Sequence, residues 1–195
     1  FGYKLEEVNN PFYSHLLRWN NANHIKKNFS SGLKETLNGY SPFDELAEKL
    51  PAEFDKWDTL AKAQWLETTI FMSGYLLSTQ GDRMGMANSI EGRYPFLDYR
   101  VIEFCSGLPA RLKLNGLNEK FLLKKLMKNR IPESILKRPK QPYRAPISSV
   151  FLSKDAPEYV KLMLSDTYTK TAGIFDFDSI SAMLSRIEKT GVASE

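Results

Sequence analysis

The sequence predicts a mainly α-helical fold, on three observations. Apolar residues recur at helical spacing along much of the 195 residues, as with Leu66, Ile70 and Leu77. Helix start and stop signals divide these stretches: Ser41 before Pro42 is typical of a first turn, and Pro51 of a stop. The only strand-like alternation, over residues 111–114, is too short to establish a sheet.

The first half of the chain supplies several of these helices in order. Residues 11–37 are rich in apolar and aromatic side chains at helical spacing, and a longer amphipathic helix is expected over residues 57–78. Gly81 ends that helix, and Asp82 is then placed to cap a second, short one. His15 and His24 have no ligand partners at metal-site spacing, so we interpret them as packing or surface histidines.

The second half continues in the same way. Asp98 is expected to cap a helix over residues 99–106 that stops at Gly107, and Asn118 to cap the next one. That next helix should turn Phe121, Leu122 and Leu126 inwards and end at Pro132, and residues 147–195 should form further helices. Cys105 is the only cysteine, which excludes an internal disulfide, and its apolar neighbourhood predicts a small buried residue.

Residues 90–98, IEGRYPFLD, carry the most informative chemistry. Pro95 prevents a helix from running through this point, and Gly92 permits a backbone geometry, or a close approach to a ligand, that a Cβ would block. We expect Phe96 and Leu97 to pin the segment to a core and so to fix the neighbouring charged side chains. The alternative is a solvated Glu–Arg pair followed by an ordinary buried helix entry.

The longer run of residues 81–98, GDRMGMANSIEGRYPFLD, resembles the synthetase domain of glutamine-hydrolysing asparagine synthetases. Residues 138–141, RPKQ, resemble the second signature of the same family, and intermediate pieces of the match occur in the same order over residues 81–146. The resemblance implies the C-terminal helical portion of an adenine-nucleotide alpha-hydrolase-like (ATP pyrophosphatase) α/β domain. Residues 1–195 would be a piece of that domain, with most of the parallel sheet upstream.

The resemblance also implies a reaction. Enzymes of this family activate the side-chain carboxylate of aspartate with ATP and Mg²⁺, and ammonia from a glutaminase domain then attacks the acyl-adenylate. Glu91 matches the family's catalytic glutamate, for proton transfer, and Lys140 its catalytic lysine, for electrostatic stabilisation. The substrate- or phosphate-binding residues expected beside them are Asp82, Arg83, Arg93 and Arg138.

Several parts of that machinery are missing from these residues. The Ser-Gly-Gly-x-Asp-Ser pyrophosphate loop does not occur, and neither does the N-terminal cysteine of a glutaminase. We therefore expect Mg²⁺ ligands upstream of this piece, no metal ligand within it, and no asparagine synthesis by this chain alone. We also expect this piece to expose an apolar face that the upstream sheet would cover in the parent. The pieces should associate through that face, and a homodimer would fit this expectation.

Two departures from the family's usual sequence leave the identity of the acceptor carboxylate open. Gly92 stands where many relatives have a small or β-branched aliphatic residue, and residues 141–144, QPYR, replace a commoner Gly-Phe. Adenylating amidotransferases that act on sugars or peptides are the alternative within this chemistry.

Composition supports a further alternative and sets the expected compartment. The net charge of +4 and the basic residues between Lys137 and Arg144 would suit a helical module that binds nucleic acid, whereas the enzyme hypothesis predicts no such binding. No apolar run is long enough to span a membrane, so a cytoplasmic enzyme is the expectation.

Overall fold

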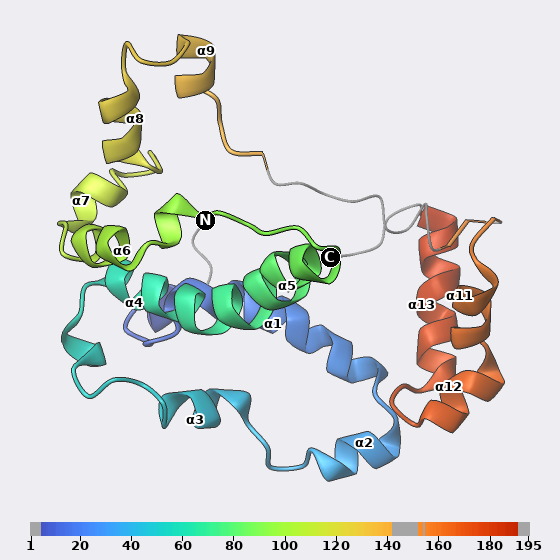
Figure 1. Cartoon of the computed structure of the whole chain (residues 1–195). Coiled ribbons are helices and arrows are strands. Elements are labelled where there is room, and N and C mark those ends of the chain that lie inside the picture. Colours follow the sequence, from blue (N-terminus) through green and yellow to red (C-terminus); the bar gives the residue numbers. More distant parts are fainter. Residues whose placement is uncertain (1–4, 142–151, 154, 191–195) are drawn as a thin grey trace. The chain divides into compact units, whose positions relative to one another are not determined.

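The computed structural model describes residues 5–141, 152–153 and 155–190, and within these ranges the chain is helical with no β-strand (Figure 1). The chain divides into two units. The first contains the described residues up to His15 together with Pro51–Lys140, and the second contains Leu16–Leu50 and the described residues after 140. In the described part of the chain, no helix is both long enough and apolar enough to cross a membrane.

The first unit is a succession of short helices around one long one. Its elements are η1 (Leu5–Glu7), η3 (Phe54–Lys56), α4 (Thr59–Leu66), η4 (Glu67–Gln80), α5 (Asp82–Ala87), η5 (Pro95–Leu97), α6 (Tyr99–Ser106), α7 (Ala110–Lys113), α8 (Phe121–Met127) and α9 (Glu133–Leu136).

The second unit joins two distant parts of the sequence. Its elements are α1 (Tyr13–Asn23), whose first turn belongs to the first unit, η2 (His24–Asn28), α2 (Ser31–Thr36), α3 (Pro42–Ala47), α11 (Glu158–Met163), α12 (Asp166–Ala172) and α13 (Phe177–Thr190).

The best-packed part of the first unit surrounds Phe54 and Leu66, whose exposed fractions are 1% and 0%. The Phe54 ring lies 5.4 Å from that of Trp57 and 5.5 Å from that of Trp65, centroid to centroid. Such aromatic pairs add to the free energy of apolar burial. His15 is also buried, and its Nε2 lies 3.2 Å from Oε1 of Glu67. These contacts hold the N-terminal half of the long helix.

The long helix consists of α4 and η4, which run on without a break. Asp58 caps α4, because its carboxylate accepts a hydrogen bond from the backbone N–H of Ala61 at 2.9 Å. η4 is a π-helix of 14 residues. The Ser73 and Ser78 hydroxyls donate to the carbonyls four residues earlier, at 2.5 and 2.6 Å, a bonding pattern that bends and loosens α-helical geometry. π-Helical turns are frequently found at functional sites.

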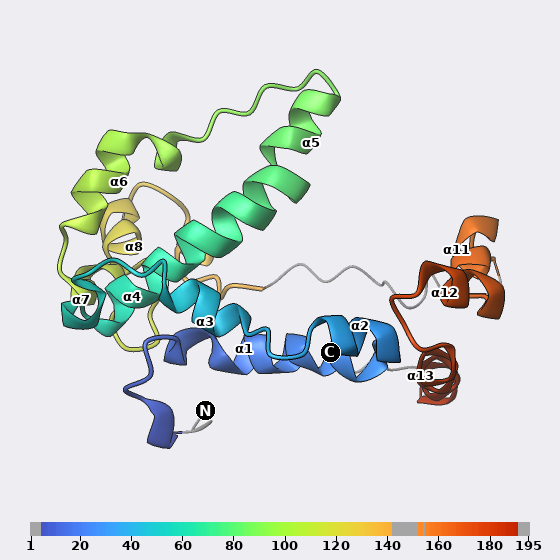
Figure 2. The same cartoon turned by 90° about the horizontal axis from the view of Figure 1, so that it is seen from below.

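Gly81 joins η4 to α5. A Cβ on Gly81 would lie 2.7 Å from the backbone oxygen of Leu76, so a side chain at this position would clash with the preceding turn. From the end of α5, the chain returns as an irregular loop that leads to α6 (Figure 2).

In the second unit, residues 28–30 are hydrogen-bonded to residues 173–176. The backbone N–H of Asp176 donates to the carbonyl of Asn28 at 2.8 Å, and that of Ser30 to the carbonyl of Ile174 at 2.9 Å. The Ser30 hydroxyl donates to the Gly173 carbonyl at 2.6 Å. These bonds attach η2 and α2 to the start of α13.

The predicted helix boundaries were confirmed in several places. Ser41 accepts a hydrogen bond from the Asp44 N–H and caps α3, with Pro42 in its first turn. α6 has the predicted bounds, with Asp98 as its cap. The long helix ends at Gly81, as expected.

Other predictions were wrong. Gly81, and not Asp82, is the N-cap of α5, and Asp82 lies in its first turn without a side-chain cap bond. α8 begins after Lys120, in the left-handed region (φ 53°), and not at Asn118, which pairs with Asn115 instead. For residues 111–114 no element was predicted, because their alternation was too short to establish a sheet, and residues 111–113 lie in the short helix α7.

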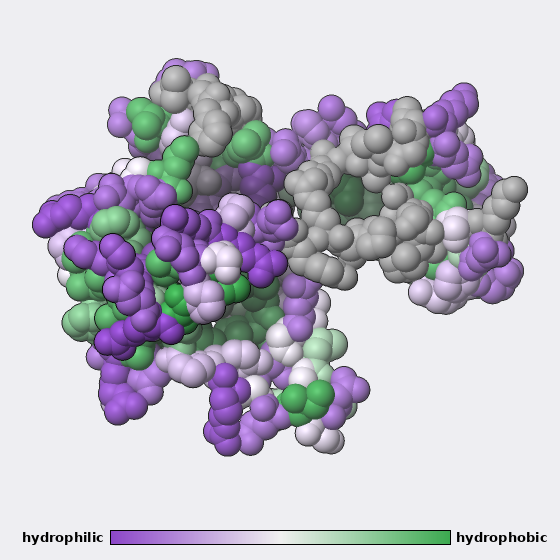
Figure 3. Space-filling model, turned by 90° about the horizontal axis from the view of Figure 1, so that it is seen from above, coloured by the Kyte–Doolittle hydropathy of each residue, from purple (hydrophilic) through white to green (hydrophobic). Residues whose placement is uncertain are grey.

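Burial was also misjudged. Phe96 is 70% exposed and does not pin its segment to a core, Leu126 is 54% exposed, and Cys105 is exposed as well. On the face drawn in Figure 3, hydrophobic side chains reach the surface in several places among hydrophilic ones. Helical periodicity identifies an apolar face correctly, but it does not state what covers that face.

Candidate active site

A hollow of about 680 Å³ lies where the long helix, α5 and the following loop meet in the first unit. This volume is within the range usual for small-molecule sites. Its lining comes from the end of η4, the first turns of α5, the loop and η5: Ser73, Leu77, Ser78, Asp82, Arg83, Met86, Gly92, Tyr94 and Leu97.

Asp82 and Arg83 give this hollow one negative and one positive charge. Both lie in the first turn of α5, directly after Gly81, so the junction with η4 sets their position. Within the described part of the chain, neither side chain is engaged in an ion pair or a side-chain hydrogen bond. The two groups can therefore meet a ligand that itself carries both signs of charge, or separate anionic and cationic groups.

The loop after α5 is held mainly by its own backbone. The Ile90 N–H donates to the Gly85 carbonyl at 2.9 Å, and the Ser89 N–H to the Met86 carbonyl at 3.0 Å. Ser89 takes a left-handed conformation with φ 58°, which turns the chain away from the helix axis. The fold thereby brings residues 92 and 94 back to the hollow.

Gly92 admits the ring of Tyr94. A Cβ on Gly92 would overlap the phenol ring, so any larger residue here requires Tyr94 to move. Because both residues line the hollow, the size of residue 92 controls its shape. The sequence predicted a special backbone geometry or a close approach to a ligand at Gly92, and the group that approaches it in the structure is the Tyr94 ring.

Glu91 and Arg93 form an ion pair on the surface of this loop. The distance from Glu91 Oε1 to Arg93 Nη2 is 3.0 Å, and the two side chains are 72% and 82% exposed. A pair this exposed contributes little to stability, so Glu91 is available for exchange with another partner. Glu91 does not line the hollow, although the next residue along the loop, Gly92, does.

Asp98 anchors the far end of the loop. Its carboxylate accepts hydrogen bonds from Nε and Nη2 of Arg100 at 3.0 and 2.8 Å and from the Arg100 N–H at 2.9 Å. The Arg100 side chain is the main reason that the pKa of Asp98 is lowered, with the backbone N–H bonds of the helix start adding to it. Asp98 is thus structural, as its capping position predicted.

Arg138 and Lys140 lie in the irregular segment that follows α9. In the described residues, no side-chain hydrogen bond or ion pair joins either of them to Glu91 or to the hollow. The remaining basic residue of that segment, Arg144, and the prolines 142 and 146 lie outside the described residues. The convergence of Lys140 and Glu91 on one cleft therefore stays a prediction.

In the described part of the chain, no group of three or more His, Cys, Asp or Glu side chains is arranged to hold a metal ion. Mg²⁺ is usually bound through one or two carboxylates together with substrate phosphates, so the predicted Mg²⁺ ligands upstream stay a prediction.

The sequence itself identifies the family. The family model described as asparagine synthase matches residues 6–194. This chain belongs to the asparagine synthase family.

Curated relatives agree with this assignment. Asparagine synthetase [glutamine-hydrolyzing] 1 of Bacillus subtilis is 30% identical over 139 residues, which are 70% of this chain and 22% of the relative. A putative asparagine synthetase of Mycobacterium tuberculosis is 33% identical over 118 residues, 59% of this chain and 18% of the relative. Amidase chyE of Penicillium rubens is 34% identical over 97 residues, 47% of this chain and 14% of the relative. The chain spans between 14% and 22% of the length of these proteins, and no solved structure matches it.

Only some of the site residues predicted from the sequence lie together in the structure. The structure brings Asp82, Arg83 and Gly92 to one hollow. Sequence reasoning missed Tyr94 and Ser78 as lining residues. The signal for Tyr94 was its position two residues after a glycine, where a large ring can fold back over the missing side chain.

Proposed function

We propose that this chain is part of the synthetase domain of a glutamine-dependent asparagine synthetase. The parent enzyme would convert aspartate, ATP and glutamine-derived ammonia to asparagine, AMP and pyrophosphate through an acyl-adenylate. The observation that carries the proposal is the hollow that places Asp82 and Arg83 beside Gly92, in a chain of the asparagine synthase family. The proposal includes a glutaminase domain in the parent chain, a cytoplasmic location, and a homodimer as its assembly.

The two charges of the hollow suit aspartate. The Arg83 guanidinium can take a carboxylate through two parallel N–H donors, and the Asp82 carboxylate can accept from the α-ammonium group. The Ser78 hydroxyl donates to the Gly74 carbonyl, which leaves its oxygen able to accept a further hydrogen bond. In this arrangement the hollow holds the amino acid and Glu91 acts at its edge.

Glu91 would accept a proton from the attacking ammonia, and Lys140 would stabilise the negative charge on phosphate and on the tetrahedral intermediate. Arg93 already holds Glu91, and would orient it. Arg138 would add positive charge next to Lys140. Mg²⁺, when bound, would neutralise phosphate charge through ligands outside the described residues.

The decisive experiment measures aspartate-dependent pyrophosphate release by the full-length parent. Glu91→Ala should lower kcat about 10²- to 10⁴-fold, the usual contribution of a positioned acid or base. Lys140→Ala should lower it roughly 10²- to 10³-fold, as the loss of one electrostatic stabiliser does. Matched controls are Glu103→Ala and Lys125→Ala, because both side chains are exposed and neither lines the hollow. Equal losses in the controls, or normal turnover in Glu91→Ala, would refute the two assignments.

Arg83→Gln separates binding from chemistry. If Arg83 meets the aspartate carboxylate, KM for aspartate should rise about tenfold while KM for ATP stays unchanged. A rise in KM for ATP alone would assign Arg83 to phosphate instead.

A related amidotransferase acting on another carboxylate is the second candidate. The amidase-named relative of Penicillium rubens supports it, as does the glycine at position 92, which enlarges the space that Tyr94 enters. Pyrophosphate release with a sugar or peptide carboxylate, and none with aspartate, would establish it. If pyrophosphate release depends on Glu91 with either kind of carboxylate, the proposed adenylation chemistry stands and only the acceptor changes.

A further inference from the structure

Tyr94 brings a hydroxyl group to the hollow of the first unit. Tyr94 lines this hollow together with Gly92, and its atoms closest to a Cβ built on Gly92 are Oη, Cζ and Cε2. The hydroxyl end of the ring therefore lies over the Gly92 backbone. Nothing in the proposed reaction uses this hydroxyl.

The backbone holds the base of the Tyr94 side chain in place. The Leu97 N–H donates to the Tyr94 carbonyl at 2.8 Å, at the turn formed by η5. Pro95 restricts the backbone of the residue before it. Because a tyrosine side chain has only two rotatable bonds, little further ordering is needed to place its hydroxyl when a ligand binds.

The link between Gly92 and the ring is one of space. Gly92 is not among the glycines with a positive φ in the described chain, so its backbone conformation is open to other residues. A Cβ at this position would overlap the phenol, which is the far end of a side chain and can swing away. Gly92→Ala should therefore displace the hydroxyl without a large cost in stability.

The Tyr94 hydroxyl is one of the hydrogen-bond donors that the lining can offer to a ligand. The hydroxyls of Ser73 and Ser78 already donate to helix carbonyls, and an ionised Asp82 only accepts. In the part of the chain that the structure describes, the Tyr94 hydroxyl makes no hydrogen bond. The donors of the lining side chains that stay available are those of Arg83 and Tyr94.

Aspartate carries three charged groups, and three side chains of the hollow can match them. In the proposed function, Arg83 takes one carboxylate and Asp82 the α-ammonium group, which leaves the other carboxylate without a donor. The Tyr94 hydroxyl can supply that bond, and it lies over the residue next to Glu91, to which proton transfer is assigned. The side-chain carboxylate is the one that reacts, so the group that holds it acts on the choice of acceptor.

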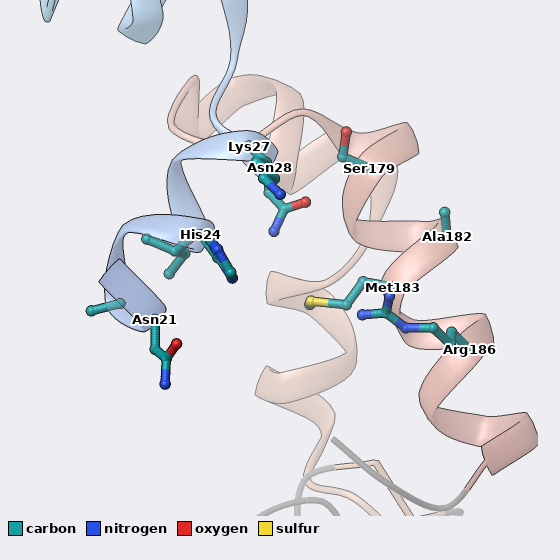
Figure 4. A pocket seen from close by; sticks show the side chains of 10 residues that line it. Asn21, His24, Lys27, Asn28, Ser179, Ala182, Met183 and Arg186 are labelled. Carbon is teal, nitrogen blue, oxygen red and sulfur yellow. The ribbon is translucent and has the colours of Figure 1, made fainter. Parts of the chain in front are cut away.

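The second unit also has a hollow, of about 730 Å³, between α13 and the end of α1 with η2 (Figure 4). No aspartate or glutamate is among its lining residues, so it offers no carboxylate to an ammonium group. The combination of an acidic, a basic and a phenolic side chain belongs to the hollow of the first unit.

We infer, resting on the proposed function, that Tyr94 selects the acceptor. Its hydroxyl donates a hydrogen bond to the acceptor carboxylate, which is the side-chain carboxylate in aspartate, and its ring over Gly92 limits how far that carboxylate can extend. Glutamate is one methylene longer and would bring its carboxylate onto the ring. One methylene in a binding pocket is worth about 10- to 200-fold in selectivity.

The test measures kcat and KM of the full-length parent with aspartate and with glutamate. Tyr94→Phe keeps the ring and removes the donor, so KM for aspartate should rise about tenfold while KM for ATP stays unchanged. Tyr99→Phe is the matched control, because this tyrosine is exposed and does not line the hollow, and it should change neither. Tyr94→Ala should also raise the glutamate-to-aspartate ratio of kcat/KM about tenfold.

Gly92→Ala tests the link between the two residues. It should raise KM for aspartate as Tyr94→Phe does. In the Tyr94→Ala background it should change KM by less than about twofold, since no ring is left to displace. Equal effects of Gly92→Ala in both backgrounds, or an unchanged KM in Tyr94→Phe, would overturn the inference.

A structural measurement separates this inference from the proposed function. In the 195-residue chain with ¹³C at the glycine Cα positions, Tyr94→Leu should shift the Gly92 resonance more than that of any other glycine, because the ring current is lost. Tyr99→Leu should not. A Gly92 resonance that Tyr94→Leu leaves in place would overturn the inference and leave Glu91 and Lys140 as assigned. A parent that uses another carboxylate in place of aspartate, with KM for that acceptor raised by Tyr94→Phe, would refute the proposed substrate and support the role of Tyr94.

Discussion

Two parts of the first unit use aromatic side chains in opposite ways. Around Phe54, aromatic rings pack on one another and the central ring is 1% exposed. In the family signature segment, Phe96 is 70% exposed, and Tyr99 directly beyond it is 68% exposed. The first cluster holds the helix by burial, whereas the signature segment holds its shape through backbone bonds, glycines and a capped helix start.

This difference indicates which substitutions should change the geometry of the candidate site and which should change the stability of the long helix. Loss of packing at Phe54 should loosen the whole long helix, whereas the site at its far end should respond to changes at the joints, Gly81 and Asp98. Stability and site geometry can therefore be changed separately.

The largest expected effect is on packing. Phe54→Ala should lower the free energy of unfolding of the first unit by about 3–5 kcal/mol, since it removes a fully buried ring and leaves a cavity. Phe96→Ala should change it by less than about 0.5 kcal/mol because that ring faces solvent. Urea unfolding followed by tryptophan fluorescence measures both, with Trp57 and Trp65 adjacent to the mutated ring.

If Phe54→Ala abolishes folding altogether, Phe54→Leu gives a graded version with a smaller loss. A cost at Phe96 equal to that at Phe54 would show that the signature segment is packed against another surface, and the comparison between the two clusters would fail.

The next effect concerns the joint. Gly81→Ala should destabilise the first unit by about 1–3 kcal/mol because the new Cβ meets the backbone oxygen of Leu76. Gly32→Ala in α2 is the matched control: nothing lies within 4 Å of its Cβ position, and alanine is the better helix former, so a gain of about 0.4–1 kcal/mol is expected. Thermal unfolding shows the sign of each change.

Gly81→Ala should also shift the backbone amide resonances of Asp82 and Arg83, which follow it directly, and Gly32→Ala should not. Unchanged resonances together with unchanged stability would mean that Gly81 is not what sets the geometry of the hollow.

Much of the helical framework could be predicted from local signals. Ser41 with Pro42, Asp98 with Gly107, and Gly81 all marked boundaries correctly, since capping depends on atoms within a few residues. The exposure of Phe96 and Cys105 could not be predicted in this way, because burial depends on what lies opposite in space.

The candidate site shows the same division. Asp82 and Arg83 were expected to face the same cavity as Glu91. They line one hollow together with Tyr94, and Glu91 is not among its lining residues. The π-helical geometry of η4 was not predicted, because apolar periodicity over such a stretch fits an α-helix equally well. The relation of Lys140 to Glu91 depends on a segment that has no regular structure, and no local signal fixes it.

The smallest expected effect is at the other joint, where Asp98 caps α6. Its pKa is lowered in the folded chain, mainly by the Arg100 side chain, so its contribution to stability is present above its unfolded pKa of about 3.9 and is lost as the pH falls through the folded value. Asp98→Asn keeps a capping side chain but removes the charge. The unfolding midpoint of the wild type should exceed that of Asp98→Asn slightly at pH 6, and the difference should vanish towards pH 2 and shrink in high salt. A wild-type advantage at Asp98 that persisted at pH 2 would mean that shape, and not charge, makes this cap.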